Sequence, residues 1–299
     1  MLTKLLHSIA TLYTQCIISL IYYVSLIFLP LSSRIVNNFL KQCDIEVNGN
    51  NKWDPIVSDN KFYCEFISGA FTGIGDAYTK NYFECEDLQQ FFLKICQHKY
   101  YKYICYHPAI LWWSIIRRYF DKNNAEGAYE DTGKGYDEGV FARDEEKETF
   151  RTYSCGYWRN ATTQDEAFEH NLADDGLFVI ECLPVSHKYV PTTVKLFEKY
   201  FDTKTWFPYS LELMKLIDGL FVVEDLQNIG THYARTFVEE IKIMDEDKSS
   251  LQNKVGNQIF RATRATYAYF SAELESRHYQ VYHLVLSKNG IPGGYDAVV

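Results

Sequence analysis

The chain has 299 residues, of which 47% are hydrophobic and 23% are charged, and its formal net charge is −9. This composition is typical of a globular protein and excludes a disordered one. No tract rich in Lys and Arg occurs, so the sequence predicts no nucleic-acid partner. The eight cysteines include no Cys-x-x-Cys pair and, with the histidines, show no zinc-finger spacing, so the sequence predicts no metal site.

The N-terminal segment is strongly apolar. Residues 8–33 contain no charged side chain, and a helix of about 20 apolar residues is long enough to cross a bilayer core. We therefore expect residues 1–33 to form a single hydrophobic membrane anchor. The alternative is a hydrophobic helix that lies on the protein or in the membrane interface. Scattered cysteines suggest a reducing compartment, so the catalytic part is expected to face the cytoplasm, although the flanking charges do not settle the orientation.

Residues 34–120 are expected to form a helical domain. A short helix near residue 34 runs toward a strand-like segment at 45–47 and an Asn48-Gly49 turn signal. A second apolar stretch covers 61–75, and Cys85-Glu-Asp-Leu88 opens another helix. Residues 99–120 are aromatic with basic ends, which is typical of an amphipathic helix on a membrane and equally of a buried helix. Residues 121–150 are polar and predict an exposed linker or lid.

The last part, 151–299, alternates strands and helices. Apolar runs predict strands at 177–183, 220–225 and 281–287. Helical patterns lie between them, at 194–201, 234–244 and 252–276. This order favours the closing part of a three-layer α/β sheet.

Three motifs indicate a family. The first is Gly73-Ile-Gly-Asp-Ala-Tyr78 with the block from Tyr82 to Leu88, and the second is Tyr136-Asp-x-Gly139 leading to Tyr153-Ser-Cys-Gly-Tyr-Trp158. The third runs from Asp175-Gly-Leu-Phe178 to Asn228-Ile-Gly-x-x-Tyr233. In this order they resemble the cyclopropane-fatty-acyl-phospholipid synthases, the family that includes the mycolic acid cyclopropane synthases. The resemblance covers about residues 34–287.

The resemblance implies an enzyme that transfers a methyl group from S-adenosylmethionine to the unsaturated acyl chains of phospholipids. It also implies an α/β fold in which a helical domain precedes a Rossmann-like class I methyltransferase sheet. The glycine loop that holds the methyl donor in the family has no counterpart, since the chain runs from Trp158 through His170 directly into Asn171. The sheet is therefore expected to be incomplete. An incomplete gene model, a splice form and a catalytically inactive lipid-binding or regulatory paralogue are the alternatives.

The resemblance also assigns site residues. Cys155 and Tyr233 match contacts to the bound bicarbonate that serves as the base, and Tyr153 and Ser154 match positions that touch the methyl donor. Glu181 stands where the family has a histidine, and a carboxylate there would repel an anion. Read instead as a nucleophile, Cys155 lacks a positioned His/Asn pattern.

Aromatic side chains are candidates to stabilise a carbocation, at about 0.5–2 kcal/mol for each good contact. The candidates are Tyr153, Tyr157, Trp158 and Tyr233. Three residues of the long C-terminal helix (Tyr267, Tyr269, Phe270) are further candidates, and for these three the alternative is ordinary helix packing. The expected partners are phospholipid acyl chains and the membrane. A homodimer and a pairing with a full-length paralogue both remain open.

Overall fold

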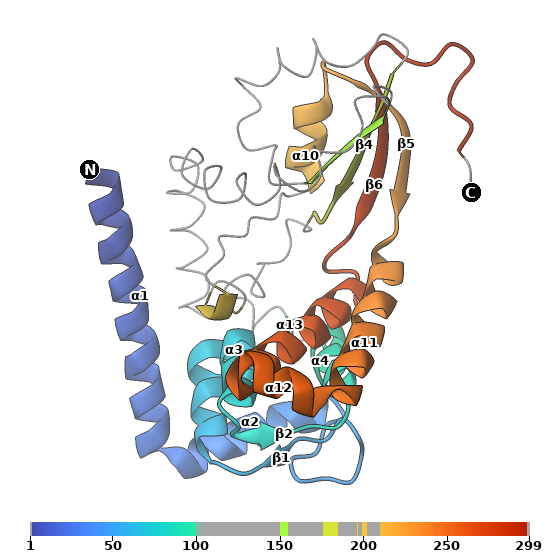
Figure 1. The fold of residues 1–299 in the computed structure, drawn as a ribbon. Coiled ribbons are helices and arrows are strands. Elements are labelled where there is room, and N and C mark those ends of the chain that lie inside the picture. Colours follow the sequence, from blue (N-terminus) through green and yellow to red (C-terminus); the bar gives the residue numbers. More distant parts are fainter. Residues whose placement is uncertain are drawn as a thin grey trace. The chain divides into compact units, whose positions relative to one another are not determined.

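The computed structural model describes residues 2–99, 101, 150–154, 176–184, 196, 199–201 and 210–297. Side chains are described from residue 12 onward, except for those of 150–154, 212 and 216. Figure 1 shows the described elements. The chain divides into two compact units: the first comprises 1–120, 189–203 and 232–278, and the second comprises 121–188, 204–231 and 279–299. The expected linker or lid lies outside the described residues up to position 149, as do most of the segment at 99–120 and half of the expected helix at 194–201.

Two helices replace the single anchor expected over 1–33. Helix α1 (Leu2–Ile27) is followed directly by α2 (Leu29–Gln42). From residue 12 onward, within the described ranges, no single helix is long and apolar enough to cross a bilayer, and α1 and α2 pass that test only as a pair bent by 102°. The expectation of one continuous anchor is therefore not supported. Pro30, in the first turn of α2, lacks the N–H that would continue the preceding helix.

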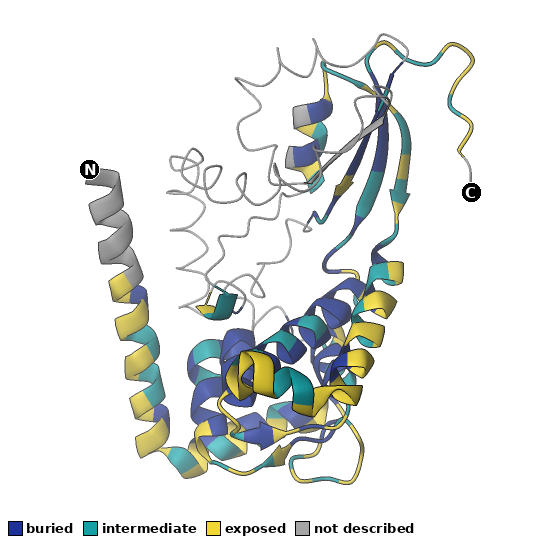
Figure 2. Cartoon of the chain, in the orientation of Figure 1, coloured by how far each residue is buried: buried dark blue, intermediate teal, exposed yellow. Residues whose placement is uncertain are grey.

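The core of the first unit forms where three helices meet: α3 (Lys61–Thr79), α4 (Leu88–Gln97) and α13 (Asn257–Glu275). Figure 2 shows their facing sides as buried. Aromatic rings fill the space between the helices, and the ring centroids of Phe71 and Tyr269 stack 4.7 Å apart. Stacked aromatic pairs add about 0.5–1.5 kcal/mol to the stabilisation from burial.

The helix expected over 252–276 is divided in two. Helix α12 (Lys248–Val255) ends at Gly256, whose φ of 85° lies in the left-handed region, and α13 begins at the next residue. Glycine takes that conformation at little cost, so it ends a helix readily. The helix expected over 234–244 is confirmed as part of α11 (Gly230–Glu246).

The segment at 45–47 is not the expected strand. The Asp54 carboxylate accepts hydrogen bonds from the backbone N–H groups of Glu46 (2.8 Å) and Asn51 (2.9 Å), so these donors are satisfied within the loop. Pairing occurs later in the chain, where the short strands β1 (Ile56–Val57) and β2 (Phe83–Glu84) are antiparallel.

The second unit contains a four-stranded sheet in the order β3-β4-β6-β5. Its strands are β3 (Phe150–Ser154), β4 (Leu177–Cys182), β5 (Val222–Asn228) and β6 (Tyr282–Ser287). Strands β3 and β4 are parallel, and β6 is antiparallel to both of its neighbours. The three strands expected after residue 176 are thus confirmed.

Helix α10 (Ser210–Ile217) buries its apolar side against this sheet. Leu213 and Ile217 join one cluster with side chains from β4 and β6, among them Ile180 and Leu284. Together with the helical first unit, this confirms the predicted α/β class.

Candidate functional site

The parallel strands β3 and β4 bring three of the predicted site residues together. Their register pairs Tyr153 with Ile180 and Ser154 with Glu181, next to the carboxyl end of each strand. Carboxyl ends of parallel strands form the edge at which open α/β sheets bind ligands. The exposed Glu181 thus lies beside the two positions assigned to the methyl donor. Cys155, the next residue after β3, lies outside the described residues.

Tyr233 lies in the first turn of α11 and belongs to the first unit, so its predicted role at the anion stays a prediction. The motif that leads to it makes a strand-to-helix turn. Asn228 Oδ1 accepts a hydrogen bond from the Gly230 N–H at 3.2 Å. A Cβ at Gly230 would stand 3.2 Å from the backbone nitrogen of Val281, so glycine allows this close approach.

The first motif serves packing. Gly73 and Gly75 both lie within α3, which is kinked at Ala70. A Cβ at Gly73 would come 1.9 Å from the Glu65 carbonyl oxygen, and one at Gly75 would come 2.7 Å from Leu196. Glycine is thus required at position 73, because the backbone folds back on itself there, and Gly75 leaves room for the Leu196 side chain.

These observations bear on whether the chain can hold S-adenosylmethionine. Such a donor is held where glycines let the backbone approach it and a helix N-terminus follows. Within the described ranges, the Gly-x-Gly at Gly73 and Gly75 lies inside a helix. The space beside the two glycines is occupied by Glu65 and Leu196. The described residues therefore do not fit a donor cradle.

Asp76, the next polar residue of the motif, is also engaged. Its carboxylate accepts a hydrogen bond from Lys199 Nζ at 2.6 Å and another from the Tyr200 hydroxyl at 2.9 Å. Burial, followed by the charge of Asp76, raises the pKa of Tyr200. This hydroxyl therefore stays protonated at neutral pH and acts as a donor.

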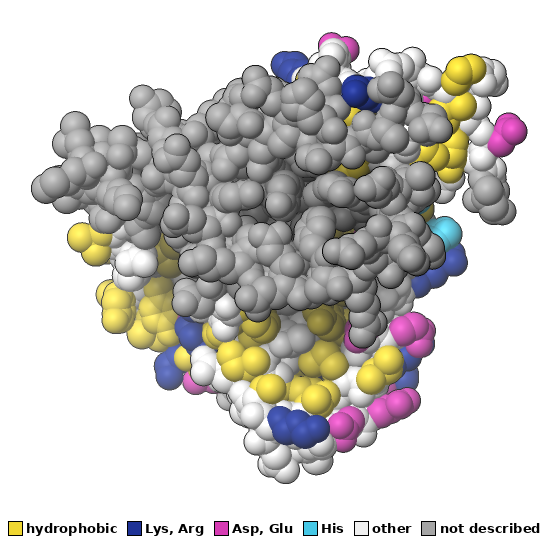
Figure 3. Space-filling model, turned by 45° about the horizontal axis from the view of Figure 1, so that its top comes forward, with side chains coloured by type: hydrophobic (Ala, Val, Ile, Leu, Met, Phe, Trp, Pro, Cys, Tyr) yellow, Lys and Arg dark blue, Asp and Glu magenta, His cyan; other side chains and the backbone are white. Residues whose placement is uncertain are grey.

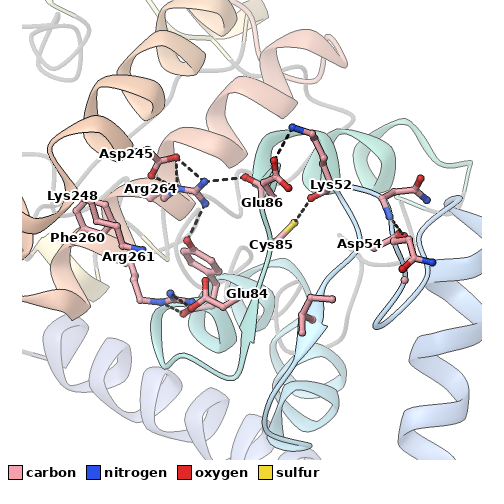
Figure 4. Close-up of a pocket in the computed structure, with 15 residues that line it drawn as sticks. Lys52, Asp54, Glu84, Cys85, Glu86, Asp245, Lys248, Phe260, Arg261 and Arg264 are labelled. Carbon is pink, nitrogen blue, oxygen red and sulfur yellow. Dashed lines mark hydrogen bonds and ion pairs between the residues drawn. The ribbon is translucent and has the colours of Figure 1, made fainter.

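A pocket of about 710 Å³ opens in the first unit, between α12, α13 and the segments around Lys52 and Glu84 (Figure 4). Arg261 of α13 is 4% exposed and contacts three acceptors. They are the Tyr78 carbonyl (2.6 Å), the Phe83 carbonyl (2.9 Å) and the Glu84 carboxylate (2.6 Å). Its guanidinium carbon also stands 3.9 Å from the centroid of the Tyr78 ring.

Arg264, one helical turn later, binds the hydroxyl group of the same tyrosine. It donates to Asp245 at 2.9 Å, to the Tyr78 hydroxyl at 2.9 Å and to the Glu86 carbonyl at 3.1 Å. Burial, the largest single cause, lowers the pKa of Arg264, but the hydrogen bonds and charges of Asp245 and Tyr78 together raise this pKa above its usual range. Hydrogen bonds from both arginines thus connect α13 to the segment from Tyr78 to Glu86.

Cys85 lines the same pocket. Burial raises the pKa of its thiol to about 12, although Arg264 opposes the shift. The thiol is therefore protonated at neutral pH and is a poor nucleophile.

A second polar cluster is fully buried in the first unit. Glu273 Oε2 lies 2.8 Å from His278 Nδ1, and the Tyr101 hydroxyl donates to the same carboxylate. Cys96 offers its sulfur to this group. Sequence spacing could not predict the cluster, because 172 residues separate Tyr101 from Glu273. The nearest local signal is a glutamate within the run Tyr267 to Leu274, which has aromatic and small side chains and no other charge.

Of the three aromatic candidates of the long helix, Tyr269 and Phe270 are buried and Tyr267 is partly buried. Tyr269 contacts Phe71 and Phe92, while Phe270 and Tyr267 both contact Phe237. Ordinary helix packing accounts for all three.

Comparison with known proteins tests the resemblance. No family model matches the chain. Cyclopropane-fatty-acyl-phospholipid synthases from two Escherichia coli strains, K12 and O6:H1, are each 25% identical to it over 139 residues. The predicted resemblance is confirmed. The match covers 46% of this chain but only 36% of each synthase, so it spans about a third of these curated relatives.

Solved structures of cyclopropane synthases are found among the structural neighbours of the chain, at low similarity. Mycolic acid cyclopropane synthase CmaA1, in a complex with SAH and CTAB, is 13% identical with a TM-score of 0.41, over 50% of this chain and 57% of that one. Cyclopropane synthase MmaA2 from Mycobacterium tuberculosis is 14% identical with a TM-score of 0.42, over 52% and 65%. Both TM-scores are low, so the inference of relatedness rests on the sequence match.

Proposed function

We propose that the chain is an S-adenosylmethionine-dependent methyltransferase of the cyclopropane-synthase type that acts on unsaturated acyl chains of phospholipids. The observation that carries this proposal is the 139-residue match to cyclopropane-fatty-acyl-phospholipid synthases. The pairing of Ser154 with Glu181 supports it, because the motif resemblance implies that these two positions contribute to one site. Cytoplasmic orientation and any pairing with a second chain belong to the same proposal.

The direct test is titration of the full chain with S-adenosylmethionine, followed by incubation with vesicles. We expect binding near micromolar and transfer of the methyl group to a phospholipid with a cis double bond. A fully saturated phospholipid is the matched control, since it has no alkene to attack the methyl group. Absence of donor binding in a folded protein would contradict the proposal.

Glu181 provides a finer test, because we propose that a bicarbonate anion binds beside this position. A carboxylate beside bicarbonate repels it, whereas an imidazole can donate a hydrogen bond. We expect Glu181→His to raise kcat/KM roughly tenfold, the equivalent of about 1.4 kcal/mol, with the gain growing as bicarbonate is added. Glu181→Gln removes the charge without adding the ring and should give a smaller gain. Equal rates for all three proteins at every bicarbonate concentration would argue against an anion at this position.

A second candidate function is that of a catalytically inactive lipid-binding relative. It is favoured by the absence of a donor cradle among the described residues and by the carboxylate at Glu181. Vesicle association without donor binding is the result that selects it.

Both functions require contact with lipid, and the N-terminal helices carry apolar side chains suited to it. Leu20 is 64% exposed, Ile27 74% and Leu31 56%. Figure 3 shows hydrophobic side chains gathered at the edge where α1 lies in Figure 1. We propose that these helices lie in the membrane interface, where exposed apolar side chains become buried.

We expect Ile27→Asp to weaken vesicle binding about tenfold or more, because burial of one such side chain contributes roughly 1.5–3 kcal/mol. Flotation with phosphatidylcholine vesicles measures the effect. The matched control is Ile243→Asp, at an isoleucine of α11 that is 59% exposed. Equal flotation of both variants would show that α1 does not carry the attachment.

A further inference from the structure

Four buried side chains converge where α4 and α13 end. Cys96 lies in the last turn of α4, and Glu273 lies in the last turn of α13. His278 follows three residues after α13. Cys96 is 2% exposed, Glu273 0%, His278 7% and the nearby Tyr101 2%.

The donor atoms of three of them are close enough to bind one ion. The Cys96 sulfur, a carboxylate oxygen of Glu273 and a ring nitrogen of His278 all lie within 4.8 Å of one another. Zinc bonds of about 2.0–2.3 Å hold ligand atoms roughly 3–4 Å apart. Small side-chain rotations would therefore bring these atoms to bonding positions.

Charge favours a cation at this place. A fully buried carboxylate is costly unless a positive partner faces it. A divalent ion bound by a thiolate, a carboxylate and a neutral imidazole forms a group with no net charge. Binding would release the thiol proton of Cys96 and any proton on the ring nitrogen that takes the metal.

We propose that Cys96, Glu273 and His278 bind a divalent transition metal ion of the zinc class. Thiolate and imidazole select such ions over magnesium and calcium, which prefer oxygen ligands alone. Cys96 does not reach solvent, so the site is closed and joins the end of α4 to the end of α13. The inference is independent of the proposed methyl transfer.

Tyr101 is the positioning residue. Its hydroxyl donates to the Glu273 carboxylate, and its ring stacks on His278 with centroids 4.4 Å apart. Hydrogen bonds from outside the metal shell orient the ligands, and losing one typically weakens metal affinity about 10- to 100-fold. Tyr101→Phe should show a loss of that size.

The test is titration of the chelator-treated full chain with Co²⁺, a spectroscopic probe of zinc sites. We expect one equivalent to bind with a thiolate-to-metal charge-transfer band, and Zn²⁺ to displace it. Cys96→Ser should lose that band and His278→Gln should weaken binding. Cys64→Ser, which replaces a buried thiol of α3, should behave like the wild type.

Wild-type measurements decide the matter even if a variant fails to fold. X-ray absorption of the zinc-loaded chain should show one sulfur ligand together with nitrogen and oxygen ligands. Failure of the wild type to bind stoichiometric Co²⁺, or a charge-transfer band that persists in folded Cys96→Ser, would overturn the proposal.

Discussion

Replacing Gly73 by alanine is expected to destabilise the first unit by about 3 kcal/mol or more. The added Cβ would stand 1.9 Å from the carbonyl oxygen of Glu65, which is a backbone atom and cannot rotate away. Overpacking a well-packed interior typically costs about 1–3 kcal/mol, and a clash with backbone belongs at the upper end. Hydrogen exchange of the α3 amides measures the effect on this unit, since the two units need not unfold together.

The same helix offers a matched control. Around Gly69 nothing lies within 4 Å of the position that a Cβ would take, so Gly69→Ala meets open space. Alanine favours a helix by about 1 kcal/mol over glycine, so this variant should be neutral or slightly stabilising. Gly75→Ala should be intermediate, because its contact is the flexible side chain of Leu196. Similar losses at Gly69 and Gly73 would refute the packing argument.

Replacing Arg264 by methionine is expected to lower the free energy of unfolding of the first unit by about 3 kcal/mol, near the lower end for breaking a buried charge pair. The Tyr78 hydroxyl and the Glu86 carbonyl would lose their charged donor. Asp245 is 42% exposed on its side chain and can return to water, which limits the loss. Urea denaturation monitored by hydrogen exchange of α13 measures the change.

Arg235→Met on α11 is the control for removing a positive charge, since Arg235 is exposed. Surface substitutions usually change stability by less than about 0.5 kcal/mol. Asp245→Asn should cost less than Arg264→Met, because it leaves the contacts of Arg264 with Tyr78 and Glu86 intact. If Arg264→Met lowered the free energy of unfolding no more than Arg235→Met, the hydrogen bonds of Arg264 would contribute little to holding α13 in place.

Much of the local structure was predictable. Apolar runs near 177, 220 and 281 became β4, β5 and β6, because strand-forming apolar side chains follow one another directly in the sequence. The segment at 45–47 misled the prediction, because the partner of its N–H group is the Asp54 carboxylate and not a neighbouring strand. The local sequence pattern indicates how apolar a segment is, but it does not indicate which group will accept the hydrogen bonds of its backbone N–H groups.

For the site, the motifs located the residues but not all of their roles. Tyr153, Ser154 and Glu181 were assigned through family resemblance, and the register of β3 with β4 places them at one edge. Gly73 and Gly75 lie in a motif of the family, yet their role in packing α3 became visible only when Glu65 and Leu196 came into contact with them.

The amino-acid sequence by itself determined the family resemblance, the α/β class and the positions of the strands after residue 176. Each of these depends on residues that are close together in the sequence, and their spacing along the chain does not depend on the tertiary fold. The tertiary structure alone decided that Arg261 and Arg264 both contact Tyr78, and that Cys96 lies close to Glu273 and His278. These contacts join residues far apart in the chain, and they exist only because α13 packs against α3 and α4.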